Sequence, residues 1–182
     1  MELYKDNYYH FYNRSNNREL LFKERDNYIY FLRKYRFHLD EHLETIAYCL
    51  MPTHFHFLIK IISEDISELK SKIGTLQSSY TRGINKRFRR QGSLFQKHAK
   101  MKLVDEPSYF VNLVTYIHQN PLRANLVDKQ EDWEFSSFQD YVELRNGSLP
   151  KKELILSKFE NPKSYYKFSQ TIISEVKAKY WI

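Results

Sequence analysis

Residues 45–62 read TIAYCLMPTHFHFLIKII, and this segment decides the fold. Residues 45–51 form a short apolar run typical of a strand, and Pro52-Thr53 interrupts it. In residues 54–62 the strand pattern resumes, with phenylalanines between the histidines. Successive side chains of a strand point to opposite faces, so His54 and His56 share one face. The segment predicts two antiparallel strands joined by a tight connection, with both imidazoles on the same side.

The flanking patterns predict the remaining elements of a small mixed fold. Residues 8–12 read as a strand, residues 24–38 as an amphipathic helix, residues 66–88 as the clearest helix, and residues 97–104 as another strand. The order is strand, helix, strand, strand, helix, strand. This order predicts the α+β class, with a ferredoxin-like βαββαβ core built on an antiparallel sheet.

A further helix is predicted after Pro107, which suits a first helical turn. Phe110, Leu113 and Ile117 recur along it at helical spacing, and Asn120-Pro121 is expected to end or kink it.

Residues 1–127 are predicted to form the main domain, and residues 128–182 a helical C-terminal extension packed on it. The repeat of Phe168, Ile172, Val176 and Tyr180 predicts a final helix over residues 165–180. Four aromatic residues could pack the extension back onto the domain: Trp133, Phe135, Phe138 and Tyr141.

The bulk composition favours a polyanionic partner. The chain has 182 residues, 42% of them hydrophobic, and its 29 Lys and Arg against 22 Asp and Glu give a formal net charge of +7. Its 16% aromatic content suits single-stranded nucleic acid, whose bases stack on rings, although an aromatic core is the plainer alternative. The single cysteine, Cys49, excludes a disulfide framework. With neither a signal-like N-terminus nor a membrane-spanning apolar run, a soluble cytoplasmic protein with no membrane partner is expected.

Four residues could form one active site. Tyr116 and Asn120 are four positions apart, so they lie on one helix face. Two imidazoles and an amide oxygen, from His54, His56 and Asn120, could hold Mg²⁺ or Mn²⁺ with positions left for water and phosphate. Tyr116 beside that metal could attack a phosphodiester as a covalent nucleophile. Each residue also has a plainer reading: polar strand face for the histidines, packing for Tyr116 and a helix end for Asn120.

Basic residues could grip phosphates near such a site. They form a dense stretch at the end of the second helix, where a solvated helix end is the alternative: Arg82, Lys86, Arg87, Arg89 and Arg90. His118 lies about 200° around its helix from Tyr116 and is read as a nucleic-acid contact or a surface residue. His98 falls on the last predicted strand and has no assigned role.

Five segments together resemble the IS200-like single-tyrosine HUH transposases, most closely the REP-associated tyrosine transposases. They are residues 10–14 (HFYNR), 47–56 (AYCLMPTHFH), 92–96 (GSLFQ), 116–121 (YIHQNP) and 133–137 (WEFSS). The resemblance implies a ferredoxin-like core, His54, His56 and Asn120 as metal ligands, and Tyr116 as the nucleophile.

The resemblance also implies that the substrate is single-stranded DNA with a hairpin near the cleavage site, with Arg14 among the DNA contacts. The expected activity is metal-dependent nicking and strand transfer through a covalent 5′-phosphotyrosine. Two other functions stay open: a catalytically inactive nucleic-acid-binding module and a small metal-dependent hydrolase. Some relatives act as homodimers and others as monomers, and the sequence does not choose between them.

Overall fold

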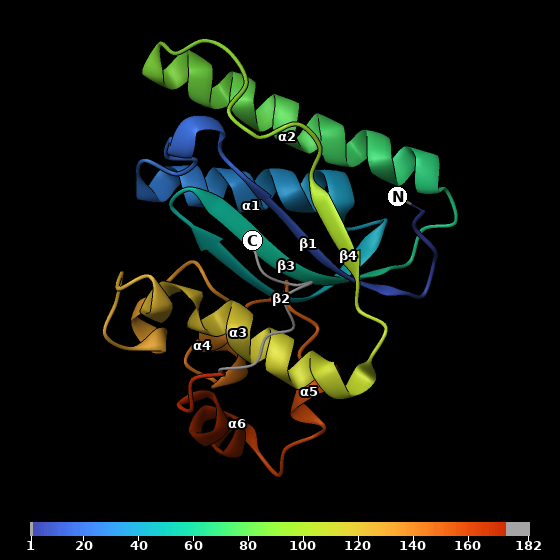
Figure 1. Ribbon diagram of the computed structural model, residues 1–182, viewed down its shortest axis with the longest axis vertical. Helices are drawn as coiled ribbons and strands as arrows, with labels where there is room; N and C mark the ends of the chain where they lie inside the picture. The colour runs from blue at the N-terminus through green and yellow to red at the C-terminus, as the bar shows by residue number, and fades with distance from the viewer. Residues whose placement is uncertain (1, 174–182) are drawn as a thin grey trace.

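A four-stranded antiparallel sheet forms the centre of the computed structural model, which describes residues 2–173 (Figure 1). Its strands follow one another across the sheet in the order β2-β3-β1-β4. Every neighbouring pair is antiparallel, and the bounds are β1 (Tyr8–Arg14), β2 (Leu43–Met51), β3 (His54–Ile61) and β4 (Lys100–Leu103). The two-residue turn Pro52-Thr53 joins β2 to β3, which confirms the predicted hairpin.

Helices cover both faces of the sheet. Figure 1 shows α1 (Arg25–Leu39) and α2 (Ile66–Phe88) on one face, and α3 (Phe110–Arg123) on the other. Shorter elements complete the chain: η1 (Asn16–Arg18), η2 (Pro107–Tyr109), η3 (Gln130–Asp132), α4 (Phe138–Tyr141), α5 (Glu153–Leu156) and α6 (Pro162–Ser169). The order β1-α1-β2-β3-α2-β4 is the ferredoxin-like pattern, so the predicted fold class is confirmed.

The alternation of β3 divides the interior into two cores. Phe55, Phe57 and Ile59 point into the core under α1 and α2, whereas Leu58 belongs to the core under α3. The bulge in β2 shifts its register with β3 by one residue, since Thr45 pairs with Ile59 and Ala47 with Leu58. The central strand is therefore buried on both faces.

The last strand is shorter than predicted because of its backbone at His98. This residue has φ 63°, in the left-handed region that strands do not use. The strand accordingly begins at Lys100 rather than at residue 97, and His98 lies in the loop before it, exposed to solvent.

Asn120-Pro121 was predicted to end or kink helix α3; the helix continues through Pro121 to Arg123, so it does not end there, and the kink stays a prediction. A proline in a helix leaves the carbonyl four residues earlier without its N–H donor. Here the side-chain amide of Asn120 approaches that carbonyl, with Nδ2 at 3.4 Å from the Ile117 oxygen. The last turn is thereby retained.

Residues after Arg123 return to the sheet and pair with the outer edge of β2. The Leu50 N–H donates to the Phe135 carbonyl at 2.9 Å, and the Ser137 N–H donates to the Tyr48 carbonyl at 2.9 Å. Further along, the Lys151 N–H donates to Thr45 at 2.7 Å. The edge of the sheet is thus covered by the extension.

Aromatic residues fix this extension on both cores. The Phe135 ring stacks on Tyr28 of α1 at 3.8 Å, and the Trp133 indole donates to the Leu50 carbonyl at 3.0 Å. Phe138 and Tyr141 are fully buried beneath α3. The domain boundary near residue 127 stays a prediction.

The last described helix is shorter than the one predicted over residues 165–180. Helix α6 begins after Asn161, whose side chain accepts from the Ser164 N–H, and Pro162 occupies the first turn. It ends at Ser169, and residues 174–182 lie outside the described part of the chain. The four-residue spacing of apolar side chains therefore does not correspond to one continuous helix.

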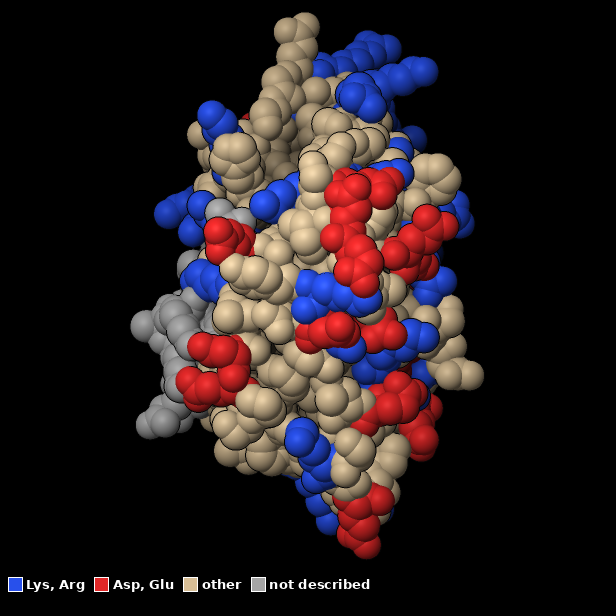
Figure 2. All heavy atoms as spheres, turned by 90° about the vertical axis from the view of Figure 1, so that its right-hand side faces the viewer, with Lys and Arg blue, Asp and Glu red and all other residues tan. Residues whose placement is uncertain are grey.

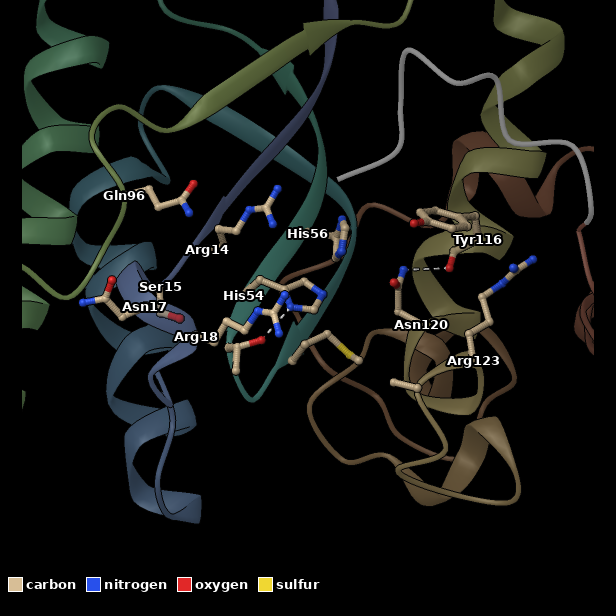
Figure 3. A pocket seen from close by; sticks show the side chains of 13 residues that line it. Arg14, Ser15, Asn17, Arg18, His54, His56, Gln96, Tyr116, Asn120 and Arg123 are labelled. Atoms are coloured by element: carbon tan, nitrogen blue, oxygen red, sulfur yellow. Dashed lines mark hydrogen bonds between the residues drawn. The ribbon is translucent and has the colours of Figure 1, made fainter.

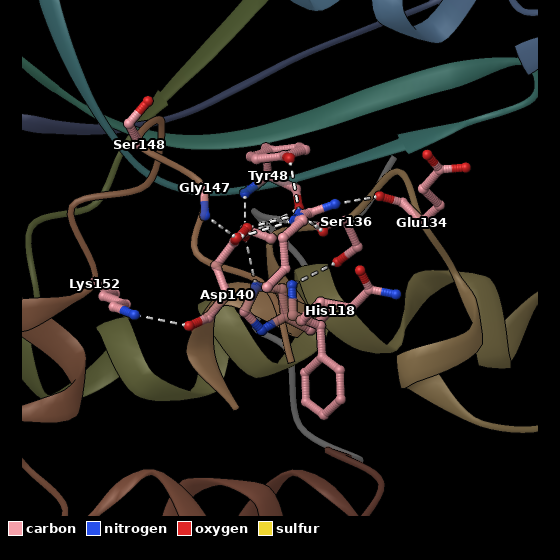
Figure 4. A network of polar contacts seen from close by, with 12 residues as sticks. Tyr48, His118, Glu134, Ser136, Asp140, Gly147, Ser148 and Lys152 are labelled. Carbon is pink, nitrogen blue, oxygen red and sulfur yellow. Dashed lines mark hydrogen bonds and ion pairs between the residues drawn. The ribbon is translucent and has the colours of Figure 1, made fainter. Parts of the chain in front are cut away.

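A buried ion pair holds the extension together beneath Tyr48 (Figure 4). Arg145 contacts both carboxylate oxygens of Asp140, with Nε to Oδ1 at 3.0 Å and Nη2 to Oδ2 at 2.6 Å. The same guanidinium reaches the Tyr48 hydroxyl and the Ser136 carbonyl, and the Gly147 N–H donates to Asp140. Asp140 is 1% exposed, so these contacts take the place of water around its carboxylate.

We expect Asp140→Ala to lower the free energy of unfolding by about 3 kcal/mol, because it leaves a half-buried guanidinium and a backbone N–H without their acceptor. Urea unfolding followed by tryptophan fluorescence measures this. The exposed carboxylate of Asp128 on the same extension is the control, and Asp128→Ala should change stability by less than about 0.5 kcal/mol. Equal effects of the two substitutions would contradict the assignment.

Candidate active site

Two imidazoles stand on the face of β3 that looks toward α3. His54 and His56 have ring centroids 5.1 Å apart, with planes at 82°. His56 is 1% exposed, whereas His54 lies nearer the surface at the hairpin turn. The two rings therefore converge on one space, as the alternation of the strand predicts.

A third histidine, for which no role was predicted, lies behind the pair. His10 of β1 is fully buried, and its Nε2 is 2.9 Å from Nδ1 of His56. The tautomer in which His56 donates through Nδ1 leaves its Nε2 with a lone pair. That Nε2 is buried and has no hydrogen-bond partner among the described residues. Pairing of β1 with β3 could have indicated His10. Tyr12 lies opposite His56, and His10, two residues before Tyr12, is on the same face of the sheet.

Helix α3 brings Tyr116 and Asn120 to the same space from the opposite layer. The Tyr116 ring meets the His56 ring edge to face at 6.1 Å, and Figure 3 shows its hydroxyl end directed toward His56. The Asn120 amide nitrogen donates to the Tyr116 carbonyl at 2.9 Å as well as approaching Ile117. With Nδ2 held against the helix, Oδ1 is the atom of Asn120 left for a ligand.

All four predicted residues line one cavity of about 710 Å³ within a single chain (Figure 3). Three arginines lie around it: Arg14 at the end of β1, Arg18 in η1 and Arg123 at the end of α3. The Arg123 guanidinium lies 5.4 Å from the centroid of the Tyr116 ring. Arg18 and Arg123 belong to none of the sequence motifs, and the fold places them beside the cavity.

Burial keeps the histidines neutral. It lowers the pKa of His54 to about 4, with a smaller contribution from Arg14, and the pKa of His10 to about 3, with a smaller contribution from Lys102. The pKa of His56 is also well below its ordinary value, from burial first and then from His10 and His54. Neutral imidazole is the form that binds metals.

Tyr116 responds to the same burial in the other direction. Loss of solvent raises its pKa, and the charge of Arg123 opposes this effect. The phenol is therefore protonated at neutral pH in the protein alone.

Most of the basic residues predicted to contact DNA lie away from this cavity. Arg14 lines it, but Arg82, Lys86 and Arg89 are exposed on or beyond the end of α2. Arg87 pairs with Glu24, and Arg90 pairs with Glu19 at 3.0 Å. In Figure 2 the Lys and Arg side chains at the upper end, where α2 lies in Figure 1, have few acidic neighbours, whereas both signs mix lower down.

His118 is buried, so its prediction as a DNA contact or surface residue was wrong. It is 0% exposed, with Nδ1 2.7 Å from the Tyr165 hydroxyl and Nε2 2.8 Å from Ser137 Oγ. The face of α3 opposite the cavity is covered by the extension, which the helical period alone does not reveal. His118 therefore joins α3 to the extension (Figure 4).

A metal centre of acidic, histidine or cysteine side chains is not preformed. Within residues 2–173 no group of three or more such residues is arranged to hold an ion. The predicted ligands are two histidines and one asparagine amide, so they do not make up such a group of three. Separately, none of the helices in the described part of the chain is both long and apolar enough to cross a membrane.

Comparison with known proteins identifies the family of this fold and site. The family model described as "Transposase IS200 like" matches residues 4–120, well over half of the chain. The chain belongs to the IS200-like transposase family. The match extends from before β1 to Asn120, so it includes the predicted histidine pair, the tyrosine and the amide.

Two known proteins are similar to this chain. A Haemophilus influenzae protein named "Putative REP-associated tyrosine transposase" is 28% identical over 104 residues, which span 52% of this chain and 58% of that protein. A REP-associated tyrosine transposase with a solved structure, bound to a REP hairpin, superposes with a TM-score of 0.62 at 19% identity. That match covers 79% of this chain and 86% of the other, and it supports the fold.

We expect stability to fall in acid partly through His118. Burial, with a smaller contribution from Arg145, lowers its pKa from 6.5 to about 3. Above about pH 6.5 both states are neutral at this residue. Between about pH 6.5 and 3 only the unfolded chain binds the proton, so unfolding becomes easier as pH falls. His118→Gln should therefore flatten the dependence of unfolding free energy on pH by about 1.4 kcal/mol per pH unit between about pH 4 and 5.5.

Urea unfolding at a series of pH values measures the slopes. His98→Gln, at an exposed position before β4, is the matched control and should leave the pH dependence of the unfolding free energy as in wild type. Parallel slopes for wild type and His118→Gln would show that His118 is not held neutral in the folded state.

Proposed function

We propose that this chain nicks single-stranded DNA and transfers the strand through a covalent 5′-phosphotyrosine at Tyr116, with a divalent metal held by His54, His56 and Asn120. The observation that carries the proposal is the single cavity lined by these four side chains. A nucleophile, two nitrogen ligands and an amide oxygen from elements far apart in sequence meet there.

The donors available in the cavity fit Mg²⁺ or Mn²⁺. His56 Nε2 is buried without a hydrogen bond among the described residues, and the Thr53 hydroxyl lies 3.1 Å from Nδ1 of His54, which leaves Nε2 of His54 available. Asn120 contributes Oδ1. Three neutral ligands leave coordination positions for water and phosphate oxygens, as Mg²⁺ prefers. When bound, the metal supplies Lewis-acid polarisation of the scissile phosphate and neutralises its charge.

The chain's own residues perform the transfer. The Tyr116 oxygen forms a bond to phosphorus while the bond from phosphorus to the 3′ oxygen breaks. The tyrosine proton is lost to solvent or a neighbouring base, and the departing 3′ oxygen gains a proton as a free 3′-OH. The same number of phosphoester bonds exists before and after, so a second 3′-OH can reverse the step and rejoin the strand without a nucleotide cofactor.

The arginines around the cavity suit an anionic strand. Arg14, Arg18 and Arg123 can contact phosphates on either side of the scissile bond. Arg123 also favours the phenolate that forms as Tyr116 attacks. The REP hairpin bound by a structural neighbour supports a hairpin near the cleavage site as the substrate here.

The arrangement supports action by one chain. Since β3 and α3 of the same chain supply all four residues, no residue of a second copy is needed to complete the site. A homodimer stays a prediction.

The alternative is an inactive nucleic-acid-binding module, and the adduct distinguishes the two. We expect the protein, incubated with hairpin-containing single-stranded DNA and Mn²⁺, to give a covalent complex on a denaturing gel. Tyr116→Phe should abolish it, because the attacking oxygen is removed while the buried ring is kept.

Tyr30→Phe, on α1, is the matched control and should form the adduct as wild type does. An adduct that persists in Tyr116→Phe refutes the nucleophile. Salt-sensitive binding without cleavage in any divalent metal supports the inactive module instead.

We expect metal affinity to depend on His10 as a positioning residue for His56. Isothermal titration with Mn²⁺ should show no binding by His56→Ala. His10→Phe keeps a ring but removes the acceptor at 2.9 Å, so its affinity should be about 10–100-fold weaker. His10→Gln restores an acceptor, so its Mn²⁺ affinity should fall less than that of His10→Phe.

Circular dichroism establishes that each variant is folded. Equal Mn²⁺ affinity in wild type and His10→Phe would remove His10 from this role. A wild type that binds neither Mn²⁺ nor Mg²⁺, with or without DNA, would refute the metal proposal itself.

A further inference from the structure

A groove along α2 continues from the candidate active site. It consists of a cavity of about 760 Å³ and another of about 530 Å³, which share Gly74, Gln77 and His98. The larger one also shares Gln96 with the active-site cavity. Figure 3 shows Gln96 on the chain segment that lies between α2 and the site. We call these two cavities the α2 groove.

The charge lining this path has a single sign. Within residues 2–173 no aspartate or glutamate lines the α2 groove or the active-site cavity, although the chain has 22 of them. The α2 groove is lined by Lys70, Arg82 and Lys97. No ion pair among the described residues involves these three, whereas Arg87 and Arg90 nearby are paired with glutamates. The groove therefore has unneutralised positive charge.

The α2 side of the groove includes several small and polar side chains. Gly74 lies in the middle of the helix, where glycine is less favourable than alanine. A Cβ at Gly74 would meet nothing within 4 Å, so packing does not explain the glycine. Beyond it along α2, Ser78 and Thr81 also line the groove. This surface lets another backbone approach closely and offers it hydroxyl groups.

The chemistry of the lining selects phosphates rather than bases. Lysine, arginine, hydroxyl and amide groups are those that contact phosphate oxygens. Stacking of unpaired bases needs exposed rings; Phe95 is only 4% exposed, so the His98 imidazole is the one exposed ring among the described residues of the groove. A strand held here would be gripped by its backbone with little regard to sequence.

We propose that the α2 groove holds the sugar-phosphate backbone of the single strand that leads to the scissile phosphate. The inference rests on the proposed function, since the strand cut at Tyr116 must continue out of the active-site cavity. The α2 groove adjoins that cavity at Gln96 and offers a continuous cationic path. In this proposal Arg82 and Lys97 contact the DNA backbone, whereas Arg87 and Arg90 do not.

The first test is the salt dependence of binding. Affinity for a labelled mixed-sequence single-stranded oligonucleotide is measured in the Tyr116→Phe background, between about 50 and 200 mM salt, so that cleavage plays no part. Each phosphate contact on a single strand contributes a slope of about −0.7 to log K against log salt. The double variant Arg82→Gln/Lys97→Gln should therefore be shallower by about 1.4.

The matched control removes the same charge elsewhere. Lys158→Gln/Lys163→Gln changes two exposed lysines of the extension and should keep the wild-type slope. Equal salt-dependence slopes for the Tyr116→Phe parent and the groove variant would overturn the proposal. So would a slope change seen only with duplex hairpin stems and not with single strands.

The second test uses the space above Gly74. Gly74→Glu and Gly74→Gln place side chains of equal size in the groove, and both residues favour helix. The glutamate should weaken single-strand binding about tenfold relative to the glutamine, because it opposes phosphates. Equal affinities of these two variants would overturn the proposal. These readouts need no cleavage, so a failure of adduct formation in wild type would count against the proposed function and not against the groove.

Discussion

The burial of β3 on both faces is the constraint on which the rest of the structure depends. One face gives Phe55 and Phe57 to the core under α1 and α2. The other carries imidazoles into an interior where a polar group is tolerated only with a hydrogen-bond partner. β1 provides that partner for His56 through His10. Because the same face must also be covered, α3 lies across it, and the helix that closes the second core is the helix that carries Tyr116 and Asn120. Architecture and candidate chemistry thus arise from one requirement.

Local periodicity predicted the elements that periodicity controls, and it failed where contacts distant in sequence decide. The hairpin of residues 45–62, the helix Ile66–Phe88 and the ferredoxin-like order follow from alternation and helical spacing. The same spacing put Tyr116 and Asn120 on one face. His118 was wrongly read as exposed because the covering extension lies outside any local window. Of the two outcomes expected at Asn120-Pro121, an end or a kink, the end does not occur, and the Asn120 side chain approaches the carbonyl that lacks its donor. His98 lies outside the predicted strand because its backbone is left-handed, a conformation that the sequence pattern did not indicate.

Burial also divides the electrostatics of the site into a neutral centre and a charged rim. The histidines lose their protons at neutral pH, so they offer lone pairs to a cation without competing protonation. The charge near them comes from arginines, which attract an anionic strand. Burial raises the pKa of Tyr116 at the same time, which keeps the proposed nucleophile protonated until a substrate and metal change its surroundings. One physical effect therefore prepares the ligands and restrains the attacking group.

The pairing of residues 135–137 and 150–151 with β2 has a consequence for the life of the chain during synthesis. Until those residues emerge from the ribosome, β2 presents an open row of backbone N–H and C=O groups beside an apolar sheet, the arrangement that invites pairing between chains. The family-matched segment ends at residue 120, before this cover exists. In the folded protein the extension occupies that edge, so the backbone groups of β2 that it pairs with are not available to another chain.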